Sequence, residues 1–101
     1  MSYFNIVPKT VYQNNTATSY EICLDNNTTV ECFKPEVTST EASKMETFFG
    51  SSNCEVYVPD YIECSATISD IYFHCGLYDN YLNCSGRNLN CIIENGDLTC
   101  T

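Results

Sequence analysis

The chain has 101 residues, a net charge of −9 and eight cysteines, and each of these numbers excludes a class of protein. The length fits a single domain, and this share of cysteine is typical of disulfide scaffolds rather than of cytosolic enzymes. Only four residues are lysine or arginine. Because nucleic-acid binding requires basic residues that neutralise phosphates, we expect no nucleic-acid partner. No stretch of the sequence is long and apolar enough for membrane insertion.

The first nine residues have neither a basic start nor an apolar run, so they do not match a signal peptide. Oxidised cysteines then require one of two histories. Either a leader has been removed, or the protein is oxidised outside the secretory route, as virion proteins are. We therefore expect an extracellular location or a place on a virion or particle surface.

Residues 1–19 are rich in asparagine and threonine and contain no cysteine. Apolar residues are present there, but Pro8 interrupts them. We expect an extended N-terminal arm over 1–19, followed by a single cysteine-rich β domain over 20–101. The arm is either a tail or edge strand, or a segment that reaches onto a neighbouring subunit.

A repeated cysteine spacing predicts a hairpin over 20–33 and two more near the C-terminus. In three pairs the cysteines enclose eight residues with turn formers in the middle: Cys23 and Cys32, Cys75 and Cys84, and Cys91 and Cys100. In the last pair the turn centres on Asn95-Gly96, which favours a type I′ turn. The fourth residue pair out from such a turn is non-hydrogen-bonded, with Cα atoms about 4.5 Å apart. That distance lies within the range of disulfides, so each spacing predicts a disulfide across a hairpin.

Residues 34–53 differ in character and predict one short helix over about 39–49. Thr38 and Glu41 match a capping box, in which Thr38 caps the first turn and the Glu41 side chain reaches back to the Thr38 N–H. Three apolar residues then share a helical face: Ala42, Met45 and Phe49. Gly50 follows as a helix stop.

Residues 54–101 predict a meander of short strands. The expected strands lie near 54–58, 61–66, 70–76, 80–85, 88–93 and 97–101. Cys54 and Cys64 enclose nine residues, and Pro59-Asp60 supplies a longer loop between them. The preferred connectivity is 23–32, 54–64, 75–84 and 91–100, out of 105 that eight cysteines allow.

The expected fold is mainly β: a small disulfide-stapled antiparallel sandwich or barrel of hairpins with one short helix. In six places a hydrophobic residue, a polar residue and a cysteine follow one another. Residues i and i+2 of a strand share a face. Cysteine and hydrophobe are therefore expected to face the core together, with the polar residue toward water.

No constellation of residues predicts catalysis, a cofactor or a metal site. Structural zinc sites use cysteines two to four residues apart, and the tightest spacing here encloses six residues. The single histidine, His74, adjoins Cys75, and on a strand the two point to opposite faces, so no thiol has a base beside it. We expect no enzyme activity.

Two sets of residues are candidates for surface roles. Four asparagines begin glycosylation sequons: Asn14, Asn26, Asn27 and Asn83. Five tyrosines of the meander are candidates for an interface: Tyr57, Tyr61, Tyr72, Tyr78 and Tyr81. The sequence favours a non-enzymatic structural or assembly protein of an extracellular or particle surface, such as a virion coat or filament subunit. It would assemble with itself or with a neighbouring coat subunit. The alternative is a secreted binding module, lectin-like in that it would bind a glycan.

Overall fold

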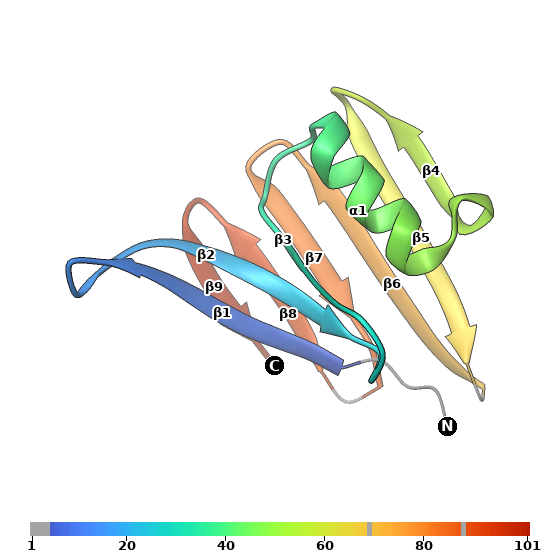
Figure 1. Cartoon of the computed structure of the whole chain (residues 1–101), viewed down its shortest axis with the longest axis horizontal. Helices are drawn as coiled ribbons and strands as arrows, with labels where there is room; N and C mark the ends of the chain where they lie inside the picture. The colour runs from blue at the N-terminus through green and yellow to red at the C-terminus, as the bar shows by residue number, and fades with distance from the viewer. Residues whose placement is uncertain (1–4, 69, 88) are drawn as a thin grey trace.

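The computed structural model describes residues 5–68, 70–87 and 89–101 and contains two antiparallel sheets and one helix (Figure 1). Sheet A consists of β1 (Asn5–Gln13), β2 (Thr16–Asp25) and β3 (Val30–Phe33). The helix α1 (Ser39–Phe49) and a 3-10 turn η1 (Ser51–Asn53) follow. Sheet B consists of β4 (Cys54–Tyr57), β5 (Tyr61–Ile68), β6 (Ile71–Tyr78), β7 (Tyr81–Ser85), β8 (Asn90–Glu94) and β9 (Asp97–Cys100).

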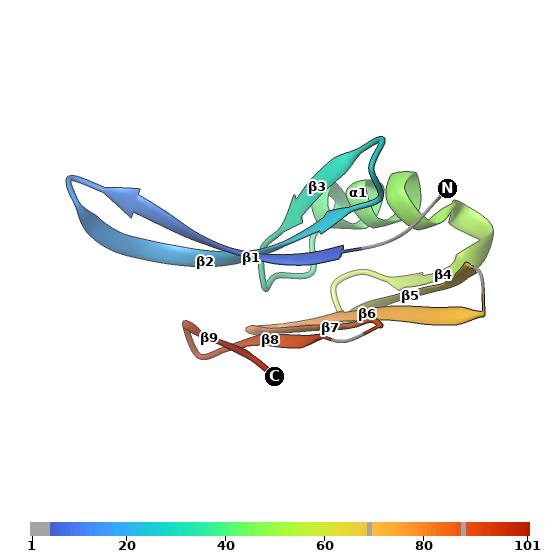
Figure 2. The ribbon, with the colours of Figure 1, turned by 90° about the horizontal axis from the view of Figure 1, so that it is seen from below.

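The two sheets form a sandwich, because sheet A and α1 lie on the same side of sheet B (Figure 2). Among the described strands, those of sheet A pair only with one another, so the barrel alternative is wrong. The core between the layers takes side chains from each part, including Ile22 and Phe33 of sheet A, Met45 of α1, and Ile62 and Leu77 of sheet B. Burying each such side chain stabilises the fold by about 1.5–3 kcal/mol.

Six cysteines stand in one row that crosses every strand of sheet B. In register from β4 to β9 they are Cys54, Cys64, Cys75, Cys84, Cys91 and Cys100. Disulfides join them two by two in that order, and a fourth joins Cys23 to Cys32. The Cα–Cα distances in the bonded pairs are 3.9 to 4.2 Å, the close spacing expected of non-hydrogen-bonded pairs. All four predicted disulfides are therefore confirmed.

An aliphatic row lies beside the cysteine row, two residues further along each strand. Its members in register are Val56, Ile62, Leu77, Leu82, Ile93 and Leu98. Both rows contribute to the core, which confirms that cysteine and hydrophobe share the inner face. The alternating residues of the same strands therefore point away from sheet A and α1.

The helix has the predicted bounds, but its capping box is only half formed. The Glu41 N–H donates to Thr38 Oγ1 at 3.2 Å, as predicted. The Glu41 carboxylate does not reach back to Thr38. It accepts from the Lys34 N–H at 2.6 Å and pairs with Lys44 Nζ at 3.2 Å. The chain leaving β3 brings the Lys34 N–H close to the buried carboxylate, and that contact replaces the local one.

The hairpins of sheet B follow the predicted turns. Asn95 and Gly96 have positive φ angles of 54° and 82°, which fits the predicted type I′ turn. Three residues connect β4 to β5 at the predicted loop containing Pro59-Asp60. Strand bounds differ from the expected ones by a few residues at most. Asn88, the first residue of the strand expected over 88–93, lies outside the described residues.

The N-terminal segment forms a long hairpin rather than a single extended strand. β1 pairs with β2 from Asn5 opposite Asp25 out to Gln13 opposite Thr16. The boundary expected after residue 19 therefore falls inside β2, and residues 1–4 of the expected arm lie outside the described residues. The outer half of this hairpin projects away from the body of the molecule (Figure 1).

Candidate functional site

The outer face of sheet B is the side away from sheet A and α1 (Figure 2). The strand register places a continuous row of tyrosines on this face. We call it the tyrosine ladder; its members on β4, β5, β6 and β7 are Tyr57, Tyr61, Tyr78 and Tyr81. Successive ring centroids lie 5.0, 6.4 and 5.3 Å apart. These distances are those of interacting aromatic pairs. Four of the five tyrosines singled out from the sequence thus form one surface.

The fifth tyrosine lies on the same face, further along β6. The Tyr72 ring is stacked on His74, with ring centroids 6.2 Å apart and an interplanar angle of 9°. The Tyr72 hydroxyl and His74 Nδ1 are 3.4 Å apart. Tyr72 is 58 % exposed, so this aromatic pair is open to solvent. Five sequence candidates from four strands therefore share one face.

Two neighbours fix the position of Tyr78: Gly76 lies beneath its ring, and Glu63 accepts a hydrogen bond from its hydroxyl. A Cβ added to Gly76 would lie 2.9 Å from the Tyr78 ring, so only glycine leaves room for this ring position. The Tyr78 hydroxyl donates a hydrogen bond to Glu63. This bond, together with partial desolvation, raises the pKa of Tyr78 from 10.0 to about 12. The hydrogen bond to Glu63 therefore fixes the hydroxyl, which keeps its proton to a higher pH than an ordinary tyrosine does.

Two pairs of carboxylates face each other directly on this outer face. Glu55 of β4 is the register partner of Glu63 of β5, and Glu94 of β8 is the partner of Asp97 of β9. Like charges directly opposite each other destabilise a sheet. Tyr61 Oη lies 3.5 Å from Glu55 Oε2. Desolvation and the nearby Glu55 carboxylate raise the pKa of Tyr61. Glu55 and Glu63 therefore interact directly with the hydroxyls of Tyr61 and Tyr78.

A hollow of about 390 Å³ opens on this face beside the start of β4. Its lining includes both Glu55 and Glu63, together with Tyr72, His74 and Asn53. The hollow thus joins the carboxylate pair to the stacked Tyr72 and His74 rings. Its polar lining suits a charged or hydrogen-bonding group rather than an apolar one.

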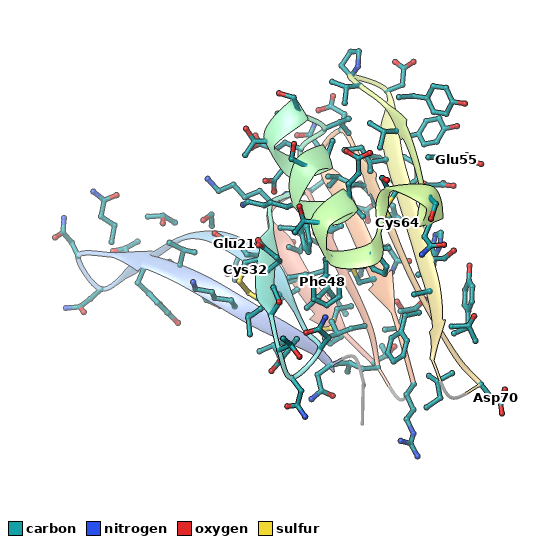
Figure 3. The ribbon with its side chains drawn as sticks, turned by 45° about the vertical axis from the view of Figure 1, so that its right-hand side comes forward. Glu21, Cys32, Phe48, Glu55, Cys64 and Asp70 are labelled. Atoms are coloured by element: carbon teal, nitrogen blue, oxygen red, sulfur yellow. A yellow bond between two sulfur atoms is a disulfide. The ribbon has the colours of Figure 1, made fainter. Side chains whose placement is uncertain are left out.

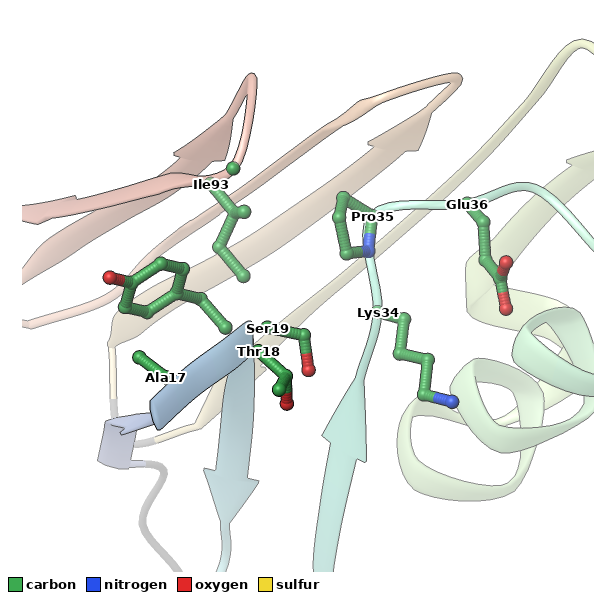
Figure 4. A pocket seen from close by; sticks show the side chains of 9 residues that line it. Ala17, Thr18, Ser19, Lys34, Pro35, Glu36 and Ile93 are labelled. Carbon is green, nitrogen blue, oxygen red and sulfur yellow. The ribbon is translucent and has the colours of Figure 1, made fainter. Parts of the chain in front are cut away.

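A second hollow of about 390 Å³ lies where the projecting hairpin leaves the body of the protein (Figure 4). β2 contributes Ala17 and Tyr20, the segment after β3 contributes Pro35, and β8 contributes Ile93. Apolar groups therefore continue from the core onto the root of the hairpin.

The described part of the chain holds one group of residues with metal-ligand chemistry, and its sulfurs are not free. Glu21 lies beside the Cys23–Cys32 disulfide, with its ligand atom and both sulfurs within 4.8 Å of one another (Figure 3). Cysteine ligates a metal only as a thiolate, and these two sulfurs are bonded to each other. The group is therefore a disulfide with an adjacent carboxylate.

The four sequon asparagines differ in how free their side chains are. Asn14 and Asn27 are exposed in turns, both with positive φ angles. Asn26 Oδ1 accepts hydrogen bonds from two backbone N–H groups of the same turn. Asn83 Nδ2 donates to Asn90 Oδ1 at 2.7 Å and to the Cys91 carbonyl at 3.2 Å. Glycan attachment replaces one of the two hydrogens of Asn83 Nδ2, so it would remove at least one of these bonds. Asn14 and Asn27 are exposed to solvent in their turns.

The cysteine spacing and the Asn95-Gly96 turn predict that Glu94 faces Asp97, and the structure confirms this pair. Sequence reasoning missed the Glu55–Glu63 pair, although the register of the Cys54–Cys64 disulfide places these residues opposite each other, and it missed the role of Gly76. The ring position over Gly76 depends on the side-chain rotamer of Tyr78, which no sequence pattern specifies.

Comparison of the chain with known protein families, curated proteins and solved structures finds no match. Within the described ranges, no helix has both the length and the apolar character needed to cross a membrane. Disulfides persist in oxidising environments, and the four found here suggest a secreted or extracellular protein. The class defined by the fold is a disulfide-stapled β sandwich, and its outer face and projecting hairpin are the candidate functional features.

Proposed function

We propose that the protein is a non-enzymatic structural subunit of an extracellular or particle surface, such as a virion coat or a filament. It would join its neighbours through the outer ribbon, which we define as residues 10–13 of β1 and 16–21 of β2. One observation carries this proposal. β3 pairs only with Ile22–Asp25, so the outer ribbon has two strands and both of its backbone edges are open. Every residue from Tyr12 to Ser19 is exposed.

An isolated two-stranded hairpin is marginally stable in water. Its open edges can pair with a strand of another chain, and such pairing is a recurring mode of protein recognition. Near the body of the protein, Pro8 and Lys9 oppose the pairing of another strand with the edge of β1. Proline cannot donate a ladder hydrogen bond, and a charged side chain disfavours pairing. Residues 10–13 contain neither a proline nor a charge. The part of the β1 edge that can pair with another strand is therefore residues 10–13, in the projecting half of the hairpin.

The test is to shorten the hairpin without removing its packed half. Replacing residues 12–18 with Asn-Gly leaves Val11 opposite Ser19 and keeps the buried Ile6, which deletion of the whole arm would remove. Asn15→Gly is the matched control, because Asn-Gly favours the same tight turn at full length. Size-exclusion chromatography with light scattering should show assemblies of the wild type and of the control above the 11.4 kDa monomer. The shortened variant should be monomeric.

Two results would contradict this proposal. The wild type could remain monomeric at every concentration, or the shortened variant could assemble as the wild type does. Intact mass of each unreduced variant checks that all four disulfides have formed.

A second candidate function is a secreted binding module, lectin-like in using the tyrosine ladder. The specific observation in its favour is the row of rings on an uncovered sheet face. Tyrosine offers apolar area together with a hydroxyl, a combination suited to binding surfaces. A glycan array with the wild type and with Tyr57→Ala, which removes a ring that is 55 % exposed, tests this function. Binding that needs Tyr57 supports it, and an array without binding counts against a glycan ligand.

A further inference from the structure

We infer that the outer face of sheet B binds an extended basic segment of another protein, whose arginine or lysine side chains lie over the tyrosine ladder and against its two carboxylate pairs. This inference rests on the second candidate function, in which this face is the binding surface, and it names the partner's chemistry.

The charge of the face is the first support. Glu55 opposes Glu63 and Glu94 opposes Asp97, so two like-charged pairs sit on one face. The strands β4 to β9 contain no lysine or arginine in their sequences. Opposed carboxylates without a base cost stability, and a cation placed between them removes that cost. The face is therefore complementary to a polycation.

The position of the rings is the second support. The register row that begins with the tyrosine ladder continues from Tyr81 to Glu94 and then to Asp97. Glu55 and Glu63 lie in the next register row on β4 and β5, beside Tyr57 and Tyr61, and each is near a tyrosine hydroxyl. One carboxylate pair therefore lies beside the first two rings of the ladder, and the other continues its row beyond the last ring. Aromatic rings attract arginine and lysine side chains placed over their faces, so the ladder also favours cations.

The dimensions match an extended peptide. Six strands span about 24 Å across the sheet, because neighbouring strands lie about 4.8 Å apart. An extended chain of about seven residues covers this distance, and every second side chain points to the same face. The fitting ligand therefore has basic residues at alternate positions.

The partner is a different protein rather than a second copy of this chain. The only strong bases are Lys9, Lys34, Lys44 and Arg87, and no two are closer than ten residues in the sequence. No segment of this chain is therefore a basic strand. A neutral glycan would use the rings but would leave the opposed carboxylates uncompensated.

The test uses the full oxidised chain and a short oligoarginine peptide with blocked ends, followed by titration calorimetry. The wild type should bind the peptide, and affinity should fall as salt rises, because exposed charges are screened. Glu55→Gln with Glu63→Gln, and separately Glu94→Gln with Asp97→Asn, should each weaken binding about tenfold, which corresponds to about 1.4 kcal/mol for each pair of lost charges.

The matched control is Glu36→Gln with Asp70→Asn. Both residues are exposed, both lie outside the ladder and the carboxylate pairs, and the change in net charge is the same. We expect this control to weaken binding less than about twofold, since an exposed pair at a distance is screened. Tyr61→Phe, which keeps the ring, should bind like the wild type. Tyr61→Leu should bind more weakly.

The outcomes separate this inference from the function on which it rests. It is overturned if the control weakens binding as much as the face variants, because the attraction is then diffuse. It is also overturned if the face variants bind like the wild type. Glycan binding that Tyr57→Ala or Tyr61→Leu abolishes, without oligoarginine binding, would overturn the basic partner and leave the binding face standing. Loss of both would overturn both.

Discussion

Tyr78 shows at the scale of single residues how the outer face is built. Its ring lies over Gly76, its hydroxyl donates to Glu63, and its neighbours in the tyrosine ladder are Tyr61 and Tyr81. The glycine allows the ring to approach the strand closely, and the hydrogen bond orients it. One glycine in one strand therefore helps to hold the centre of the ladder flat against the sheet.

Gly76→Ala should release Tyr78. The added Cβ would lie 2.9 Å from the ring, so the ring must move and the bond to Glu63 should lengthen or break. The pKa of Tyr78 should then fall from about 12 toward 10.0, and an ultraviolet titration of tyrosinate absorbance measures this shift. Ser85→Ala, a small substitution on β7, is the control and should leave the titration unchanged. An unchanged titration of the Gly76 variant would contradict the proposed role of the glycine.

The raised pKa of Tyr78 also predicts how stability depends on pH. The folded state holds the phenol proton more tightly than the unfolded state, so this contribution is fully present below pH 10.0. It should be lost as the pH rises from 10.0 to about 12, the pKa of Tyr78 in the folded state. Denaturant unfolding of the wild type and of Tyr78→Phe across that window measures it. The variant should lose less stability over the window than the wild type does, and equal losses would contradict the prediction.

At the scale of elements, Glu41 ties the helix to sheet A. Its side chain is 3 % exposed, and it connects the chain after β3 at Lys34 with the next turn of α1 at Lys44. Lys44 Nζ also donates to the Cys32 carbonyl at 3.2 Å, which extends the connection to β3. A hydrogen bond to a buried charged group is worth more than a surface one, because the buried carboxylate has little water to replace a lost partner.

Glu41→Ala should therefore lower the free energy of unfolding by about 2–3 kcal/mol, the range for losing a hydrogen bond to a charged group and leaving its partner unsatisfied. Glu46→Ala makes the same chemical change farther along α1 and should cost about 0.5 kcal/mol or less, as most substitutions away from buried networks do. Denaturant unfolding of both variants provides the comparison. Equal losses would show that the tie between helix and sheet contributes little.

At the scale of the whole molecule, all four disulfides are local. Each joins residues nine or ten positions apart, within a single hairpin. In the chain-entropy model, each disulfide that closes a loop of this size raises the free energy of unfolding by roughly 2–3 kcal/mol. The two layers are held together by the apolar core, and the disulfides hold each hairpin in register.

Because every disulfide closes a short loop, the reduced chain should recover its native connectivity on oxidation without an isomerase. The competing products should be Cys64–Cys75 and Cys84–Cys91, since these residues are also register partners in the cysteine row. Peptide mapping of the unreduced product by mass spectrometry measures the native disulfides and these two competing ones. A product dominated by bonds from Cys23 or Cys32 to sheet B would contradict this expectation.

The candidate functional features occupy separate parts of the molecule. The outer ribbon projects from the body of the molecule (Figure 1). The tyrosine ladder lies on the side of sheet B that faces away from sheet A. A subunit that joins its neighbours through the ribbon therefore keeps its tyrosine face free for a second partner. The test of assembly and the test of binding can be read independently.

The sequence by itself determined the local structure of this protein. Cysteine spacing and turn residues specified the four disulfides, and the helix signals specified its bounds, because these features depend on neighbours within about ten residues along the chain. The tyrosines could be singled out one by one, but their alignment could not.

Only the tertiary structure decided which residues of different elements lie side by side. The register between successive hairpins aligned four tyrosines into a ladder, and the packing of sheet A and α1 on one face left that ladder facing outward. The short β3 left the outer ribbon without a third strand. The exit from β3 drew the Glu41 carboxylate to Lys34 instead of Thr38. The ladder and the open ribbon depend on contacts between segments distant in sequence, where packing outweighs local preference. The Lys34–Glu41 contact spans only seven residues, but it depends on the path of the chain between β3 and α1.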